Sequence, residues 1–156
     1  MLRKGTKIAF SKKISITNRQ AHFEYTFLET YTAGIILQGT EIKSIRMGKV
    51  SLQESYCYFN LRSLWIKGLH IGAYTHGNIY NHEEKRDRQL LLHKKELNQL
   101  LKRQEKGLTI VPIKLFINNR NFAKLEIALA RGKKLYDKRK TIQARDLERS
   151  MHRELD

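Results

Sequence analysis

One long segment with the pattern of a strand, residues 23–37, constrains the fold of this chain most. Its aromatic residues Phe23, Tyr25 and Phe27 alternate with polar residues, the period of two that is typical of a half-buried strand. After Gly34 the segment is continuously apolar, and a glycine inside a strand often marks a bulge or a bend. A long strand with such a bend can serve both halves of a small closed sheet.

Two hairpins and two helices complete the predicted body. The hairpins join residues 56–59 to 64–71 and residues 115–117 to 122–130 through short polar turns. Thr40 is placed to cap a short helix that Gly48 ends, with Ile42 and Ile45 pointing inward. Leucines at helical spacing predict a second helix over residues 93–106, and Pro112 directly precedes the strand 113–117, where a missing amide is tolerable near an edge.

These elements favour a mainly β fold. We predict a small closed antiparallel barrel of the oligonucleotide-binding (OB) type, with two or three short helices and a basic C-terminal tail. A split sheet packed on helices is the alternative. The predicted organisation is a basic N-terminal arm over residues 1–20, the barrel over 21–130 and the tail over 131–156.

The charge of the chain points to a polyanionic partner. The sequence holds 31 Lys and Arg against 15 Asp and Glu, a net charge of +16. Nucleic acid is the first candidate, because cations that neutralise phosphates release condensed counterions. An anionic membrane surface is the second candidate, although no apolar stretch approaches the length of a membrane span.

The tail has too few apolar residues to form a core of its own. Leu147, Met151 and Leu155 recur every four residues, as do Arg145 and Arg149, so a helix here would carry a thin apolar stripe beside an arginine stripe. We expect a tail that is disordered when free and helical in an anionic groove.

Catalytic and metal-binding patterns are missing from the sequence. Cys57 is the single cysteine, which excludes an intrachain disulfide and suits a cytoplasmic protein. His70, His76 and His82 are spaced by six residues, a spacing that fits neither a helix nor a strand ligand pair, so we predict no metal site. With no nucleophile elbow and no phosphate-binding loop, we predict no enzymatic activity and no cofactor.

The basic segments supply the candidate RNA-binding residues. Lys43 and Arg46 project from the short helix, opposite its apolar face. Four cations bracket the leucines 90–92, which we expect to anchor the segment in the core while the cations face outward. Two histidines beside basic residues can stack on bases or contact phosphates. The candidate set is Asn18, Arg19, His22, Lys43, Arg46, Arg86, Arg88, His93, Lys94 and Lys95.

Five segments, in order, resemble the small protein B family, which binds transfer-messenger RNA (SsrA RNA). They read ETYTAGI at 29–35, LQGTEIKSIR at 37–46, RQLLLHKKEL at 88–97, KGLTIVP at 106–112 and ALARGKKLYDKR at 128–139. The chain departs from the family pattern at Thr32, where glutamate is frequent, and at Phe23, where histidine is frequent.

The resemblance implies an OB-type barrel that binds the tRNA-like domain of transfer-messenger RNA and delivers it to stalled ribosomes. It further implies elongation factor Tu as an indirect partner through the RNA, a monomeric protein, and a tail that enters the mRNA channel near the decoding centre. The tail residues assigned to that role are Gly132, Lys133, Lys134, Tyr136, Asp137, Lys138, Arg139, Arg145 and Arg149.

Three other functions stay open on the sequence alone. A structural ribosomal protein, or another OB-type RNA-binding module, would show the same charge. A small RNA-processing enzyme would need a carboxylate cluster, which the sequence does not offer.

Overall fold

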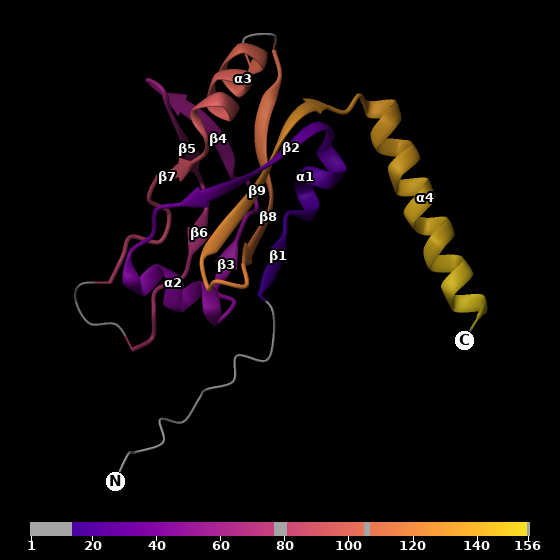
Figure 1. Cartoon of the computed structure of the whole chain (residues 1–156). Coiled ribbons are helices and arrows are strands. Elements are labelled where there is room, and N and C mark those ends of the chain that lie inside the picture. The colour runs from indigo at the N-terminus through magenta and orange to yellow at the C-terminus, as the bar shows by residue number, and fades with distance from the viewer. Residues whose placement is uncertain (1–13, 77–80, 105–106, 156) are drawn as a thin grey trace.

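The structure is a computed structural model, and it describes residues 14–76, 81–104 and 107–155. The elements, in chain order, are β1 (Ser15–Thr17), α1 (Arg19–Glu24), β2 (Tyr25–Ile35), α2 (Gly39–Arg46), β3 (Val50–Ser51), β4 (Tyr56–Asn60), β5 (Ser63–Lys67), β6 (His70–Ile71), β7 (Arg88–Leu91), α3 (Lys94–Gln104), β8 (Thr109–Ile117), β9 (Ala123–Gly132) and α4 (Leu135–Glu154). Figure 1 shows a β-rich body with α4 extending from it.

The pairings of the large antiparallel sheet form a closed circuit. The strands follow the order β8, β4, β5, β7, β2 and β9, and β9 pairs again with β8. Strand β1 pairs with Lys114–Phe116 of β8, away from the pairing with β4, and β3 and β6 form a separate pair. Only one residue pair, Cys57 with Ile110, joins β4 to β8, so the circuit is narrowest there.

Strand β2 serves two neighbours, as its sequence predicts. It pairs with β9 from Tyr25 to Gly34 and with β7 at Gly34 and Ile35. At Gly34 a Cβ would lie 3.4 Å from the Cβ of Leu91, so the glycine allows the close approach of the two strands. The strand is also irregular between Phe27 and Glu29, where its register shifts.

The beginning of the predicted strand is wrong, because residues 19–24 form helix α1. Asn18 caps this helix: the Ala21 amide donates to Asn18 Oδ1 (3.2 Å), and Asn18 Nδ2 donates to the Pro112 carbonyl (2.9 Å). Ala21 packs in a small buried cluster on β8 and β9. Capping and burial therefore override the alternating pattern of the sequence.

The other predicted elements differ mainly at their ends. Helix α2 begins at Gly39, with Gln38 instead of Thr40 as its N-cap and with Glu41 completing a capping box. Pro112 lies inside β8 and not before a strand, at a register shift between Pro112 and Lys114. The irregular pairing accommodates the missing amide.

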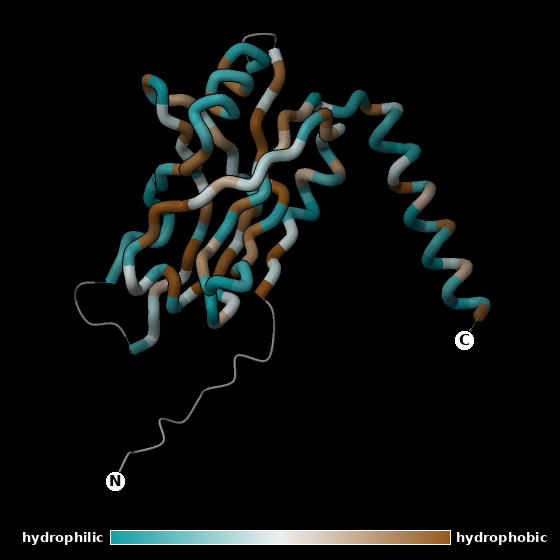
Figure 2. The backbone as a smooth tube through the Cα atoms, viewed as in Figure 1, coloured by the Kyte–Doolittle hydropathy of each residue, from teal (hydrophilic) through white to brown (hydrophobic). Residues whose placement is uncertain are grey.

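The core is built from the strands together with α2 and α3. Ile45 of α2 and Leu100 of α3 are fully buried, and they cluster with buried apolar residues from β4, β5, β7, β8 and β9. Figure 2 shows hydrophobic residues concentrated in the strands of the body, whereas α4 is largely hydrophilic. No residue of α4 is buried.

The N-terminal arm predicted over residues 1–20 lies partly outside the described residues. From Ser15 onward the chain belongs to the body, because β1 pairs with β8 and the Asn18 amide donates to the Ile113 carbonyl (2.7 Å).

Candidate nucleic-acid interface

Helix α1 presents two of the candidate residues to solvent. Arg19 and His22 are exposed, three residues apart and therefore on one face of the helix. The His22 ring makes an edge contact with Phe27, with centroids 4.9 Å apart. Asn18, in contrast, is only 6% exposed and its side chain caps the helix. The prediction that Asn18 binds RNA is not supported, since its amide is engaged inside the body.

Helix α2 presents Lys43 and Arg46 at the surface. Lys43 is exposed, and its Nζ lies 5.4 Å from the centroid of the Tyr74 ring. Arg46 is half-buried. Ile45 of this helix is buried and Ile42 is partly buried, so the inward direction predicted for the isoleucines agrees with the structure, whereas Arg46 is less exposed than predicted.

Arg88 does not face solvent, which corrects the sequence prediction. Its side chain is fully buried and forms an ion pair with the equally buried Glu41 of α2. Its Nη1 donates to the carbonyls of Leu69 (2.7 Å) and Arg86 (3.1 Å), and its Nη2 donates to that of Glu84 (3.2 Å). These hydrogen bonds satisfy the donors of the buried guanidinium. The Arg88 side chain is therefore not available to an RNA phosphate.

Arg86 belongs to the same buried network. Its side chain is 24% exposed and forms an ion pair with Glu41. The Glu41 carboxylate therefore joins α2 to β7 through two arginines. Burial would raise the pKa of Glu41, but hydrogen bonds from Arg86, the Gln38 amide and Arg88 hold it below its ordinary value. Arg86 and Arg88 position α2 and are not free cations.

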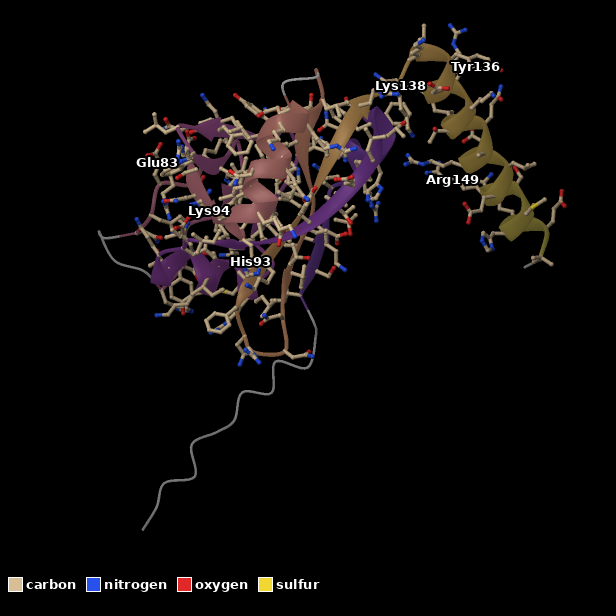
Figure 3. The ribbon with its side chains drawn as sticks, turned by 45° about the horizontal axis from the view of Figure 1, so that its top comes forward. Glu83, His93, Lys94, Tyr136, Lys138 and Arg149 are labelled. Atoms are coloured by element: carbon tan, nitrogen blue, oxygen red, sulfur yellow. The ribbon has the colours of Figure 1, made fainter. Side chains whose placement is uncertain are left out.

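The start of α3 carries a second exposed basic group. His93, Lys94 and Lys95 are all exposed, and Figure 3 shows His93 and Lys94 beside each other at this end of the helix. Cations at a helix N-terminus add to the positive end of the helix dipole, which increases the attraction for an anion. Leu91, predicted to be an anchor in the core, is instead 52% exposed beside this group.

The tail begins as an extension of the sheet. Gly132 pairs with Tyr25, and the Lys133 amide donates to the Glu24 carbonyl (2.8 Å). Lys133 is half-buried, and its Nζ donates to the His22 carbonyl (3.1 Å) and to Thr141 Oγ1 (3.2 Å). Lys133 thus connects α4 to α1.

The remaining tail candidates lie along α4. Lys134 is the N-cap residue, without a side-chain cap, and Asp137 lies in the first turn. Tyr136 is 65% exposed and lies under Lys140 Nζ, which is 4.5 Å from the ring centroid. Figure 3 shows Tyr136, Lys138 and Arg149 projecting from the helix. Arg139, Arg145 and Arg149 are exposed, whereas Lys138 is half-buried.

The sequence did not indicate the contact between α1 and α4. The Arg145 guanidinium lies 5.9 Å from the centroid of the Phe23 ring, within the range of a cation–π interaction. Residues 19–24 are helical, but the alternation of Phe23, Tyr25 and Phe27 favoured a strand and concealed this helix.

Metal ligation and membrane insertion find no support in the described part of the chain. Among residues 14–76, 81–104 and 107–155, no three His, Cys, Asp or Glu side chains come together as a metal site. His82, one of the three evenly spaced histidines, is buried and bonded to Thr40 Oγ1 (2.9 Å) and to the Ile71 carbonyl (2.9 Å). No helix in the described residues has the length and apolar character to cross a bilayer.

Comparison with known proteins gives the family. A family model described as "SmpB protein" matches residues 15–156. The SsrA-binding protein of Cytophaga hutchinsonii is 54% identical over 143 residues, which cover 91% of this chain and 94% of the relative. The chain belongs to the SmpB family.

Other SmpB relatives extend the likeness. The SsrA-binding protein of Carboxydothermus hydrogenoformans is 48% identical over 92% of this chain and 97% of its own length. A chain in a solved structure described as "tmRNA-SmpB: a journey to the center of the bacterial ribosome" is 46% identical, with a TM-score of 0.66. That likeness covers 78% of this chain and 86% of the solved one. The family resemblance predicted from the sequence is therefore confirmed.

Proposed function

We propose that this protein binds the tRNA-like domain of transfer-messenger RNA and delivers it to stalled ribosomes, where it supports peptide tagging. The observation that carries the proposal is the near-full-length likeness to SsrA-binding proteins, at 48–54% identity. The exposed cations of the body and the basic tail supply the charge that such a role needs. Because this work takes place on ribosomes, we place it in the cytoplasm.

The body acts as an OB-type barrel in this proposal. Support comes from the closed circuit of strand pairings and from the pairing of β2 with both β9 and β7. We assign RNA contact to the exposed or half-buried cations and histidines, and we assign Asn18, Arg86 and Arg88 to the scaffold that holds them. The proposed contact residues are Arg19, His22, Lys43, Arg46, His93, Lys94 and Lys95.

The tail acts on the ribosome. Leu147 and Met151 are 60% and 57% exposed on α4, so the helix has no apolar contact that would keep it folded without a partner. We propose that α4 melts in the free protein and forms in the mRNA channel, where rRNA phosphates surround its cations. The protein then acts as a monomer without a catalytic step, and elongation factor Tu joins through the RNA.

A truncation separates the two parts. The cut belongs after Lys133, because Arg131 and Gly132 still pair with β2 and the Lys133 amide bonds to Glu24. We expect the protein lacking residues 134–156 to bind transfer-messenger RNA in a gel-shift titration as the full chain does. We expect it to fail in tagging of stalled nascent chains. Normal tagging by the truncated protein would refute the role of the tail.

A salt titration tests the RNA face of the body. The double variant Lys94→Gln, Lys95→Gln should flatten the slope of log affinity against log salt by roughly 1 for each lost phosphate contact. The matched control is Lys67→Gln with Lys102→Gln, which removes the same charge from two exposed lysines outside the proposed contact set. Equal slopes for the two variants would contradict the assigned face.

A further inference from the structure

A pocket of about 320 Å³ lies between α1 and α4, and its lining is formed by basic side chains alone. The lining residues are Arg19 and His22 of α1 and Arg145 and Arg149 of α4. Each pair lies on one helix face, at spacings of three and four residues. The lining of the pocket therefore comes half from the body and half from the tail.

No carboxylate in the described part of the chain forms an ion pair with a lining arginine. The ion pairs between described residues are His70–Glu84, Arg86–Glu41, Arg88–Glu41 and Arg103–Glu29, and none of them includes Arg19, Arg145 or Arg149. Guanidinium groups that share a pocket repel one another, and α4 buries no side chain that could offset the repulsion. The cation–π contact between Arg145 and Phe23 is one attraction that acts against this repulsion.

A bound oxyanion would attract all of the lining cations and so outweigh their mutual repulsion. The planar fork of an arginine donates two parallel hydrogen bonds to a phosphate, with geometry that a lysine does not match. Arginines from two elements can bind the same phosphate from two directions, with the imidazole of His22 as a further donor. Arg149 projects from α4 in Figure 3, as a shared ligand requires.

We propose that this pocket binds one phosphate group and that the bound phosphate holds α4 against α1. The first contact between the two elements is the bond from Lys133 to the backbone of His22. The phosphate adds to the Phe23–Arg145 contact, about three turns further along α4. The orientation of the tail relative to the body then depends on the anion.

Free inorganic phosphate and an RNA backbone phosphate share the required chemistry. With free phosphate the inference is independent of the proposed function. With an RNA phosphate it rests on that function and deepens it, because the same RNA that the body binds would also set the position of the tail.

Hydrogen–deuterium exchange of the full chain tests the pocket. Exchange of the amides of residues 135–154 is measured in chloride, in inorganic phosphate at equal ionic strength, and with a short RNA duplex. A ligand at ten times its dissociation constant should slow exchange of α4 by about tenfold. Amides of β8 and β9 serve as the internal reference, since they belong to the body in every condition.

Two variants of α4 make the test specific. Arg145→Gln with Arg149→Gln removes the tail half of the pocket, and slowing by the ligand should disappear. Lys140→Gln with Arg153→Gln removes the same charge from the same helix outside the pocket, and slowing should persist. If inorganic phosphate alone slows exchange of α4, the ligand is a free anion. If the duplex slows exchange at a far lower concentration of phosphate groups than inorganic phosphate needs, the ligand is RNA. Both outcomes support the pocket.

Two results would overturn the inference. One is exchange of α4 in the full chain that neither ligand changes, and the other is equal slowing in the two variants. Neither result bears on binding of transfer-messenger RNA by the body, which the gel-shift titration measures separately. The pocket and the proposed function can therefore fail independently.

Discussion

Replacing Glu41 by Gln should destabilise the body severely. The substitution keeps the shape of the side chain but removes the negative charge between Arg86 and Arg88. Arg88 is fully buried, so its charge would be left without an ionic partner. Breaking a buried pair in this way costs about 3–5 kcal/mol, which for a chain of this size corresponds to a fall in Tm of roughly 6–20 °C.

Urea unfolding measures this loss directly. Trp65 is the single tryptophan and lies half-buried in β5, paired with Gln89 of β7, so its fluorescence reports on the part of the sheet that Arg88 supports. The matched control is Glu29→Gln, which removes the carboxylate of an ion pair with Arg103 whose side chains are both 42% exposed. A Glu41→Gln protein that unfolds at the same urea concentration as the control would refute the reasoning.

The same network predicts a dependence on pH. The pKa of Glu41 in the folded protein lies below its ordinary value, because the arginine and backbone bonds outweigh the effect of burial. A depressed pKa contributes stability that is present above the unfolded pKa, about 4.3 for a glutamate, and is lost as the pH falls through the folded pKa. The difference in free energy of unfolding between the native chain and Glu41→Gln should therefore shrink below about pH 4.

Three smaller experiments test other features of the body. Asn18→Ala removes the cap of α1 and should lower the free energy of unfolding by about 1–2 kcal/mol in urea; a change near zero would mean that the cap is dispensable. Gly68→Ala should cost about 1–3 kcal/mol, because Gly68 has a φ of +82° and its Cβ would lie 2.8 Å from the Glu54 carbonyl oxygen. Gly39→Ala, where a Cβ meets open space at the start of α2, is the control that should be at least as stable as the native chain. Burial raises the pKa of the Cys57 thiol, so its reaction with a disulfide reagent at pH 8 should be slow until urea is added, and a rate equal to that of an unfolded peptide would contradict its burial.

Local patterns predicted most of the sheet and failed where distant residues decide the outcome. The hairpins and β2 follow from alternation and turn residues, and these depend on near neighbours only. Arg88 shows the limit: its partner Glu41 lies 47 residues away. Strict alternation already places Arg88 on the same face as the buried Leu90 and turns Leu91 outward. A continuous run of three leucines concealed that pattern.

The sequence predicted which kinds of residues form the candidate interface, but not how the segments that carry them lie relative to one another. Exposed cations such as Lys43 and Lys94 lie where helix periodicity puts them. Helix α1 is only six residues long, too short for a periodic signal, and the cap that stabilises it bonds to Pro112, 94 residues away. The pocket between α1 and α4 combines two such distant segments, and neither segment indicates the other.

The junction of the tail with the sheet also has a mechanical consequence. Backbone bonds fix the chain through the Lys133 amide, and α4 begins at Leu135. When α4 is helical it is 20 residues long, about 30 Å, and it can turn at Lys134 once the Lys133–Thr141 and Phe23–Arg145 contacts are released. A rotation of only about 10° at this residue would then carry the far end of the helix by about 5 Å.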